Sequence, residues 1–191
     1  MYSPELPSSV QYALRMLVRD CEKVLGSKPE LVSDAAAARL LIRFTEQRDD
    51  CPQRAEAFGF RFYSEDGRTP SMHIVGYDAL GLIYGILAFS RIYLGIQPFW
   101  FWTDQAIAQR REISIPCERY NSPEAKVRYR GWFVNDEVCL IGWKKPYPPT
   151  REVWEPVFEA LLRCGGNMVI PGTDLPRDGI HYKLASEMGL W

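Results

Sequence analysis

The stretch that most constrains the fold is residues 127–137, which reads VRYRGWFVNDE. β-Branched and aromatic residues alternate along most of it, a pattern typical of a β-strand. Three polar residues follow at once, namely Asn135, Asp136 and Glu137. Barrel enzymes present their chemical groups at the carboxyl ends of strands in this way. We therefore expect a barrel-type strand that ends in candidate site residues.

The residues after this strand have the pattern of a parallel α/β unit. The expected elements are a helix that begins near Trp154 or Glu155, a strand over 167–171 and a helix over 181–188. Pro156 is placed in the first turn of its helix, where proline is tolerated. Residues 126–191 thus predict the first part of a (β/α) barrel. A whole barrel takes about 250 residues, so this one is incomplete.

Residues 1–120 predict a separate α+β domain. The expected elements are a helix over 10–25 capped by Ser8 or Ser9, strands over 38–44, 57–63 and 71–76, a helix from Asp78 to Gly95, and a strand over 111–116. Two helices that cover one face of a small, largely antiparallel sheet would form a two-layer domain. Residues 118–125 are the expected linker between this domain and the barrel segment.

Gly81 and Gly85 lie four residues apart in the second expected helix. Each glycine costs up to about 1 kcal/mol in a helix interior. We therefore expect the pair to serve close packing of this helix on the sheet. A membrane dimer motif with the same spacing would need an apolar span, which the sequence lacks.

Charge and hydropathy argue against two classes of partner. The formal net charge is −1, and basic residues are spread along the chain rather than gathered in the stripe that nucleic-acid binding requires. No apolar run approaches the ~20 residues needed to span a bilayer. We expect no nucleic-acid or membrane partner. Since no signal peptide is visible, the cytoplasm is the default location, with an extracellular or periplasmic one open if a leader was removed.

Cysteine and histidine usage argues against metal and disulfide chemistry. The five cysteines are far apart and form no C-x-x-C pair. His73 and His181 are the only histidines. His73 lies in an expected strand with no second ligand nearby, so we expect it to be structural. No metal and no other cofactor are expected.

Three segments, in the right order and spacing, resemble glycoside hydrolase family 115. Residues 74–104 resemble the family's N-terminal domain, in which a strand leads into a helix with an I-Y-G core and then into a Trp-rich loop. Residues 129–137 resemble its first barrel strand, which ends in Asn-Asp-Glu. Residues 158–171 resemble its first barrel helix and second strand. The resemblance covers most of the chain from about residue 57 onward.

This resemblance implies an α-glucuronidase that removes (4-O-methyl-)glucuronic acid from xylan side chains. Asp136 is then the candidate catalytic carboxylate, with Asn135 and Glu137 as binders of sugar hydroxyls. Trp100 and Trp102 are expected to stack on a sugar face. Glycoside hydrolysis needs two carboxylates across the scissile bond, supplied by different barrel strands. We therefore expect this chain to be inactive by itself.

Other interpretations stay open. The Asn135–Glu137 run also suits a solvated loop or a helix cap, and the tryptophans also suit an interface. The chain as a whole also suits a non-catalytic carbohydrate-binding or interaction module, or a relative of the hexosaminidases, which share the small α+β domain. An incomplete barrel leaves strand edges and apolar faces uncovered, so we expect self-association through residues 127–191.

Overall fold

The structure, a computed structural model, describes residues 6–32, 38–45, 49–64, 70–135, 140, 149–172 and 175–191. The chain forms two compact units. Unit 1 consists of Met1–Ile96 and Ala106–Ala125, and unit 2 consists of Gln97–Gln105 and Lys126–Trp191. The aromatic segment 97–105 therefore belongs to the second unit, although the first unit surrounds it in the sequence.

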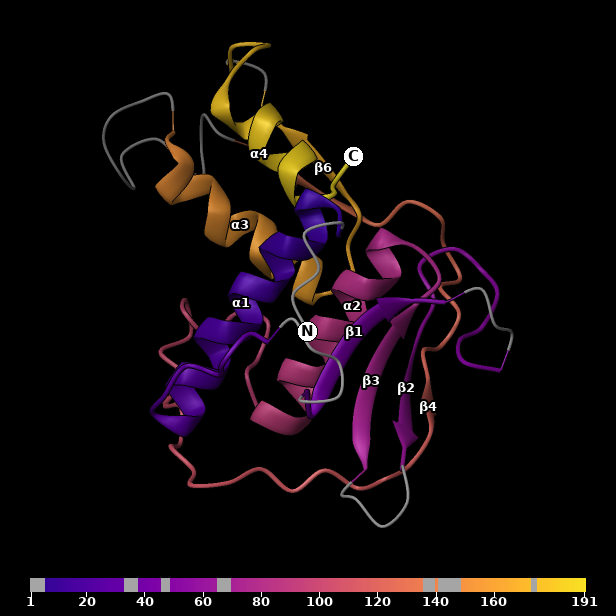
Figure 1. Cartoon of the computed structure of the whole chain (residues 1–191). Helices are drawn as coiled ribbons and strands as arrows, with labels where there is room; N and C mark the ends of the chain where they lie inside the picture. Colours follow the sequence, from indigo (N-terminus) through magenta and orange to yellow (C-terminus); the bar gives the residue numbers. More distant parts are fainter. Residues whose placement is uncertain are drawn as a thin grey trace. The chain divides into compact units, whose positions relative to one another are not determined.

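Unit 1 contains a mixed four-stranded sheet (Figure 1). Its strands are β1 (Leu40–Phe44), β2 (Phe58–Tyr63), β3 (Ser71–Gly76) and β4 (Tyr120–Asn121), in the order β1-β3-β2-β4. β2 runs antiparallel to both of its neighbours, as the expected hairpin requires. β1 pairs with β3 in parallel. The sheet is therefore less uniformly antiparallel than the sequence predicts.

Helix α2 (Ala79–Phe89) packs on this sheet, and helix α1 (Ser8–Leu25) packs on α2. α2 contacts β2 and β3, and α1 also lies against the short π-helical turn η1 (Ser90–Leu94) (Figure 1). Asp78 caps α2 as expected, since its Oδ1 accepts a 2.7 Å hydrogen bond from the Gly81 backbone N–H. The expected serine cap of α1 is wrong: Pro7 occupies that position, and no side chain caps the helix.

The two glycines of α2 allow the close packing that their spacing predicts. A Cβ on Gly81 would collide with the backbone carbonyl oxygen of Ala57, and one on Gly85 would lie 2.6 Å from Cγ2 of Ile74. Glycine at these positions lets the helix backbone approach the sheet more closely than any side chain would permit.

The strand expected over 111–116 is wrong. These residues are irregular, and β4 forms instead at Tyr120–Asn121, inside the expected linker. The backbone N–H of Arg110 donates a 2.7 Å hydrogen bond to the carbonyl of Val24 at the end of α1. This bond connects the start of the segment 111–116 to the end of α1. The segment therefore does not lie along the edge of the sheet, where it could have paired with a strand.

Unit 2 contains a strand, a helix, a strand and a helix in the expected order. They are β5 (Gly131–Val134), α3 (Arg151–Arg163), β6 (Met168–Pro171) and α4 (Ile180–Met188). β5 and β6 pair in parallel, from Gly131 with Met168 to Val134 with Pro171. The regular strand begins four residues later than the sequence pattern indicates. The described residues hold this two-stranded sheet and show no barrel.

Helix α3 begins earlier than expected. Its first residue is Arg151, so Pro156 lies in the second turn and not in the first. Proline there cannot donate the usual backbone hydrogen bond to Glu152. Val153 and Trp154 are almost fully buried, and this burial favours the additional helical turn at the N-terminus in spite of the proline.

Candidate functional site

The parallel pairing in unit 2 brings the carboxyl ends of β5 and β6 to the same edge of the sheet. Val134 pairs with Pro171, so Asn135 and Gly172 are the residues that continue from this edge. Asn135 is half-buried. Asp136 and Glu137, the other two predicted site residues of this run, lie outside the described residues.

Three aromatic rings of unit 2 form a row, which we call the aromatic row: Trp102, Phe99 and Trp132. The Phe99 ring stacks on Trp102 with centroids 6.1 Å apart and on Trp132 with centroids 5.9 Å apart. Phe99 and Trp102 are 37% and 38% exposed. Trp132 lies in β5, three residues before Asn135. The row therefore connects the predicted residue Trp102 to the strand that carries the polar run.

Trp100 makes a different kind of contact. Its indole N–H donates a 3.3 Å hydrogen bond to Oε1 of Glu159 in α3, and Nε of Arg163 donates a 2.8 Å bond to the same oxygen. Glu159 and Arg163 are only 3% and 8% exposed. The polar edge of Trp100 thus anchors the aromatic segment to a buried ion pair.

Several residues of this arrangement were missed by the sequence analysis. Trp132 was visible as an aromatic residue inside the central strand, and Glu159 and Arg163 are spaced by four on a helix, as paired charges often are. The contact of these residues with the segment 99–102 could not be read from the sequence, because it joins parts of the chain that are distant in sequence.

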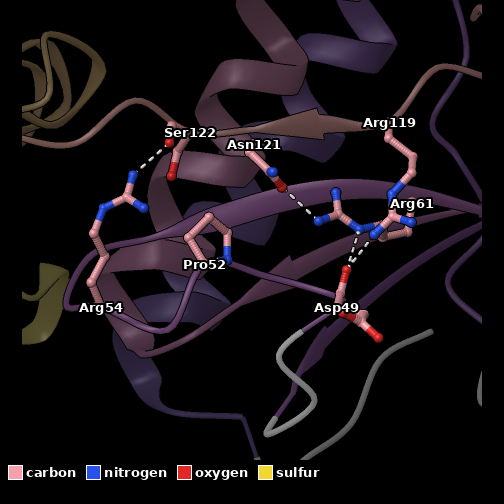
Figure 2. Close-up of a pocket in the computed structure, with 7 residues that line it drawn as sticks. All are labelled: Asp49, Pro52, Arg54, Arg61, Arg119, Asn121 and Ser122. Carbon is pink, nitrogen blue, oxygen red and sulfur yellow. Dashed lines mark hydrogen bonds between the residues drawn. The ribbon is translucent and has the colours of Figure 1, made fainter.

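Unit 1 contains an open pocket of about 460 Å³ with three arginines in its lining (Figure 2). The lining residues are Asp49, Pro52, Arg54, Arg61, Arg119, Asn121 and Ser122. None of them was singled out from the sequence. The arginines are distant from one another in sequence, and only the pairing of β2 with β4 brings Arg61 next to the segment that carries Arg119.

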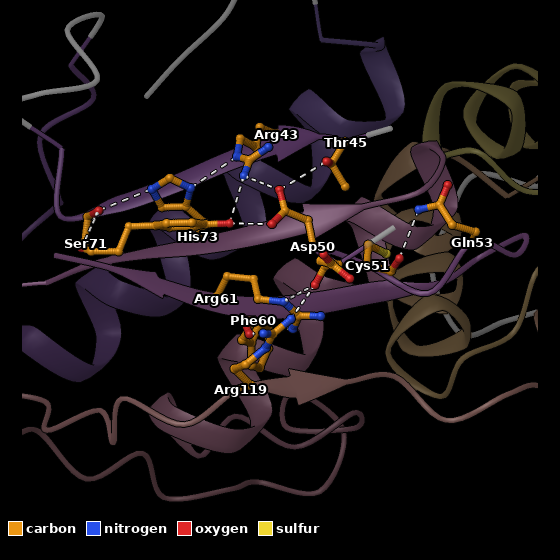
Figure 3. Close-up of polar contacts among 12 residues, drawn as sticks. Arg43, Thr45, Asp50, Cys51, Gln53, Phe60, Arg61, Ser71, His73 and Arg119 are labelled. Atoms are coloured by element: carbon orange, nitrogen blue, oxygen red, sulfur yellow. Dashed lines mark hydrogen bonds and ion pairs between the residues drawn. The ribbon is translucent and has the colours of Figure 1, made fainter. Parts of the chain in front are cut away.

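Asp50 is the centre of a second polar cluster in unit 1 (Figure 3). Its carboxylate accepts hydrogen bonds from the hydroxyl of Tyr63 at 2.5 Å, from Arg43 at 2.6 Å and from Thr45 at 3.2 Å. Burial alone would raise the pKa of Asp50, but these bonds and the Arg43 charge hold the pKa below its ordinary value of 3.8. The carboxylate of Asp50 is therefore ionised, and its oxygens already accept hydrogen bonds from these three residues.

His73 adjoins this cluster, and its hydrogen bonds exclude a serine–histidine nucleophile pair. Nε of Arg43 donates to Nδ1 of His73 at 3.1 Å, so Nδ1 is the unprotonated nitrogen. The proton of the neutral ring then sits on Nε2, which lies 3.2 Å from Oγ of Ser71 and donates to it (Figure 3). A nitrogen that donates to the serine cannot accept its proton, so this group is structural.

The described part of the chain contains neither a metal-binding cluster nor a membrane-spanning helix. Among the described residues, no three or more His, Cys, Asp or Glu side chains are arranged to hold a metal ion. Among the helices described, none combines the length and the apolar composition needed to cross a membrane.

Comparison with solved structures places the fold among glycoside hydrolases. The whole chain aligns with 27% of a family GH115 4-O-methyl-α-glucuronidase with specificity for decorated arabinogalactans, at 26% identity and a TM-score of 0.82. It also aligns over 91% of its length with 24% of a GH138 enzyme that targets pectin rhamnogalacturonan II, at 15% identity and a TM-score of 0.56. The second likeness concerns the fold alone.

The sequence comparison with family models gives one match. Residues 122–191 match the model of glycosyl hydrolase family 115. Together with the alignment of the whole chain to a solved GH115 enzyme, this match relates the chain to glycoside hydrolase family 115. No curated protein matches the chain. The chain spans about a quarter of the length of the solved enzymes it resembles.

Proposed function

We propose that this chain is the N-terminal part of an α-glucuronidase-like glycoside hydrolase that acts on glucuronic-acid-decorated polysaccharide, with xylan as the expected substrate. The observation that carries the proposal is the β5–α3–β6 crossover in a chain related to family 115, with Asn135 at its carboxyl edge. In parallel α/β enzymes this edge is where chemical groups gather.

The proposal includes a (β/α) barrel that begins with β5. Phe133 and Ile170 pair across the two strands and are 59% and 47% exposed. Directly paired residues share one face of a sheet, so this apolar face is uncovered in the chain by itself. Further strands of a barrel would cover it, since the inward side chains of a closed barrel pack against one another.

In this proposal Asp136 acts as a carboxylate in the hydrolysis, and Asn135 and Glu137 hold hydroxyl groups of the sugar. An amide and a carboxylate together offer the donors and acceptors that a polyol needs. The second carboxylate comes from another barrel strand, on the other side of the scissile bond. For this reason the 191-residue chain alone is expected to show no hydrolysis.

The aromatic residues receive distinct roles. Trp102, in the exposed part of the aromatic row, offers an apolar ring face to a pyranose ring. Trp100 instead holds the segment 97–105 in place through Glu159. Replacing Trp102 would then weaken substrate binding directly, whereas replacing Trp100 would act through the position of the segment.

The test is hydrolysis of glucuronoxylan and of decorated arabinogalactan by the full-length protein, with release of (4-O-methyl-)glucuronic acid as the readout. Arabinogalactan is included because the solved relative has specificity for decorated forms of it. Asp136→Asn is expected to lower kcat by roughly 10²–10⁴-fold, the usual contribution of an acid or base group. The matched control is Asp178→Asn, on an exposed position between β6 and α4. Full activity of Asp136→Asn would overturn the assignment.

A second candidate function, a non-catalytic carbohydrate-binding module, is favoured by the exposed aromatic row. In that case the 191-residue chain alone would bind a neutral xylooligosaccharide, and Trp102→Ala would abolish the binding. Under the hydrolase proposal the isolated chain binds such an oligosaccharide weakly or not at all, because most of the site lies on other strands.

A further inference from the structure

The arginine pocket of unit 1 carries an excess of positive charge. Three arginines line it, together with a single acidic residue, Asp49. Its volume of about 460 Å³ lies within the roughly 300–1,000 Å³ of small-molecule sites. Figure 2 shows Arg54 at one end of the pocket and Arg61 with Arg119 at the other. A small anion is the kind of ligand that this charge distribution attracts.

Arg61 is a buried cation whose described partners are uncharged. It is only 4% exposed, and its nitrogens donate to the backbone carbonyls of Asp49, Phe60 and Tyr120 and to the side-chain oxygen of Asn121. Among the described residues no acid forms an ion pair with it. Burial and the nearby charge of Arg119 lower the pKa of Arg61, and the charge of Asp50 offsets only part of this. Buried charges in proteins are as a rule compensated, so a compensating anion fits here.

Arg54 and Arg119 keep donor capacity for a ligand. In the described contacts each uses one guanidinium nitrogen, Arg54 toward the carbonyl of Ser122 and Arg119 toward the carbonyl of Asp49. Their other nitrogens carry N–H groups in the fork geometry that suits a carboxylate. Both side chains border the pocket, so they can bind a ligand while they hold its two ends in place.

The rest of the lining suits a polyhydroxylated ligand. Asp49, Asn121 and Ser122 supply side-chain or backbone oxygens, and Pro52 supplies an apolar surface. Hydroxyl groups of a sugar can donate to such oxygens. The carboxylate of Asp49 also repels strongly charged anions, which favours a ligand with one negative charge over sulfate or phosphate.

We infer that unit 1 carries a binding site for a monocarboxylate sugar, whose carboxylate pairs with Arg119 beside the buried Arg61 while Arg54, at the other end of the pocket, donates to a hydroxyl group of the sugar. The inference does not depend on the proposed hydrolase activity, because every lining residue belongs to unit 1 and none is a proposed catalytic group. The opposing interpretation is that the arginines only fasten the segments 49–54 and 119–122 to the sheet.

The experiment is calorimetric titration of the 191-residue chain at constant ionic strength. The probes are sodium glucuronate, glucose as the neutral control and sodium sulfate as the inorganic anion. The variants are Arg54→Gln and Arg119→Gln in the pocket, with Arg111→Gln as a matched control. Arg111 is an exposed arginine of the same unit outside the pocket. Circular dichroism checks that each variant is folded.

Glucuronate is expected to bind more tightly than sulfate, and glucose not at all. Each pocket variant should weaken glucuronate binding by about tenfold or more, since hydrogen bonds to a charged group are the strong class. Arg111→Gln should leave it unchanged. Asp49→Asn, which keeps the backbone carbonyl, should strengthen binding by about twofold or more because a repelling charge is removed.

Three results would overturn the inference. They are no binding of glucuronate, equal binding of glucuronate and sulfate, or binding that both pocket variants leave intact. An increase in glucuronate affinity in Asp49→Asn would distinguish a ligand site from a purely structural role of the arginines. Loss of a structural contact does not raise the affinity for a ligand. Hydrolase activity of the full-length protein is measured separately, so the two proposals can fail independently.

Discussion

Each unit contains a buried carboxylate whose charge is balanced by hydrogen-bond donors. Unit 1 contains Asp20, and unit 2 contains Glu159. Asp20 is 0% exposed, and it accepts hydrogen bonds from Oγ of Ser90 at 2.7 Å and from Arg19 at 3.0 Å. Glu159 accepts from Arg163 and from Trp100. Such groups are tolerated because their partners replace the lost water, so removing one partner leaves the other charge uncompensated.

Glu159→Ala is therefore expected to destabilise unit 2 by about 3–5 kcal/mol, since it leaves the buried guanidinium of Arg163 without its carboxylate. Urea unfolding followed by tryptophan fluorescence measures this change, because the variant also releases Trp100. The double variant Glu159→Leu with Arg163→Met should recover much of the loss. A loss below about 1 kcal/mol for the single variant would mean that the pair does not support the unit.

His73 gives unit 1 a dependence on pH whose sign follows from its surroundings. Burial and the charge of Arg43 lower the pKa of His73 below its ordinary value of 6.5. In the folded state the ring stays neutral at a pH where the unfolded chain already binds a proton. The free energy of unfolding should therefore decrease as pH falls below 6.5. Asp50 does not interfere in this window, because its pKa lies below 3.8.

The measurement is urea unfolding at pH 7.5 and at pH 5.5 for the wild type and for His73→Gln. We expect the wild type to lose stability between these values and the variant to lose less. Equal losses in the two proteins would show that His73 does not titrate as its contacts indicate.

At the scale of elements, the packing of α2 on the sheet depends on its two glycines. Alanine forms helices better than glycine by about 1 kcal/mol, so Gly→Ala at an ordinary exposed helix position would stabilise the protein. Here we expect the reverse, by about 1–3 kcal/mol, because the added methyl groups overpack the contact. Gly81→Ala should lower the free energy of unfolding more than Gly85→Ala does. The reason is that Gly81 faces a backbone carbonyl, whereas Gly85 faces a side chain that can shift.

Thermal unfolding of the two variants tests this order. A stabilised Gly81→Ala protein would show that α2 does not lie as close to Ala57 as the structure describes.

The elements that the sequence predicted well are those whose own residues decide their structure. α1, α2 and the strands β2 and β3 have clear periodicity, and Asp78 marks the start of α2 by its local chemistry. The elements that were predicted wrongly are those whose structure depends on contacts with distant parts of the chain. The alternating segment 111–116 is not a strand because its start bonds to α1, and α3 extends past the expected limit because burial of Trp154 outweighs the proline.

The candidate site likewise has parts that the local sequence predicts and parts that it does not. The polar run at 135–137 was predicted from the end of a strand, and Trp102 from its aromatic segment. The stacking of Phe99 on Trp132 and the anchoring of Trp100 by Glu159 join distant segments, so no local pattern predicts them. The arginine pocket likewise arises only when β4 pairs with β2.

At the scale of the whole molecule, the uncovered apolar pair Phe133–Ile170 has a consequence in solution. An exposed apolar sheet face tends to associate with another. We expect the 191-residue chain to self-associate with rising concentration in light scattering, and the double variant Phe133→Ser with Ile170→Ser to do so less. A clean monomer at high concentration would contradict this expectation.

The proposed function requires glucuronic acid to bind at the carboxyl ends of β5 and β6. The most direct measurement is a crystal structure of the full-length protein with the Asp136→Asn substitution and bound 4-O-methylglucuronic acid. We expect the sugar ring beside residues 135–137, with Trp102 close to it. A sugar bound on strands distant from β5, with residues 135–137 out of contact, would contradict the claim.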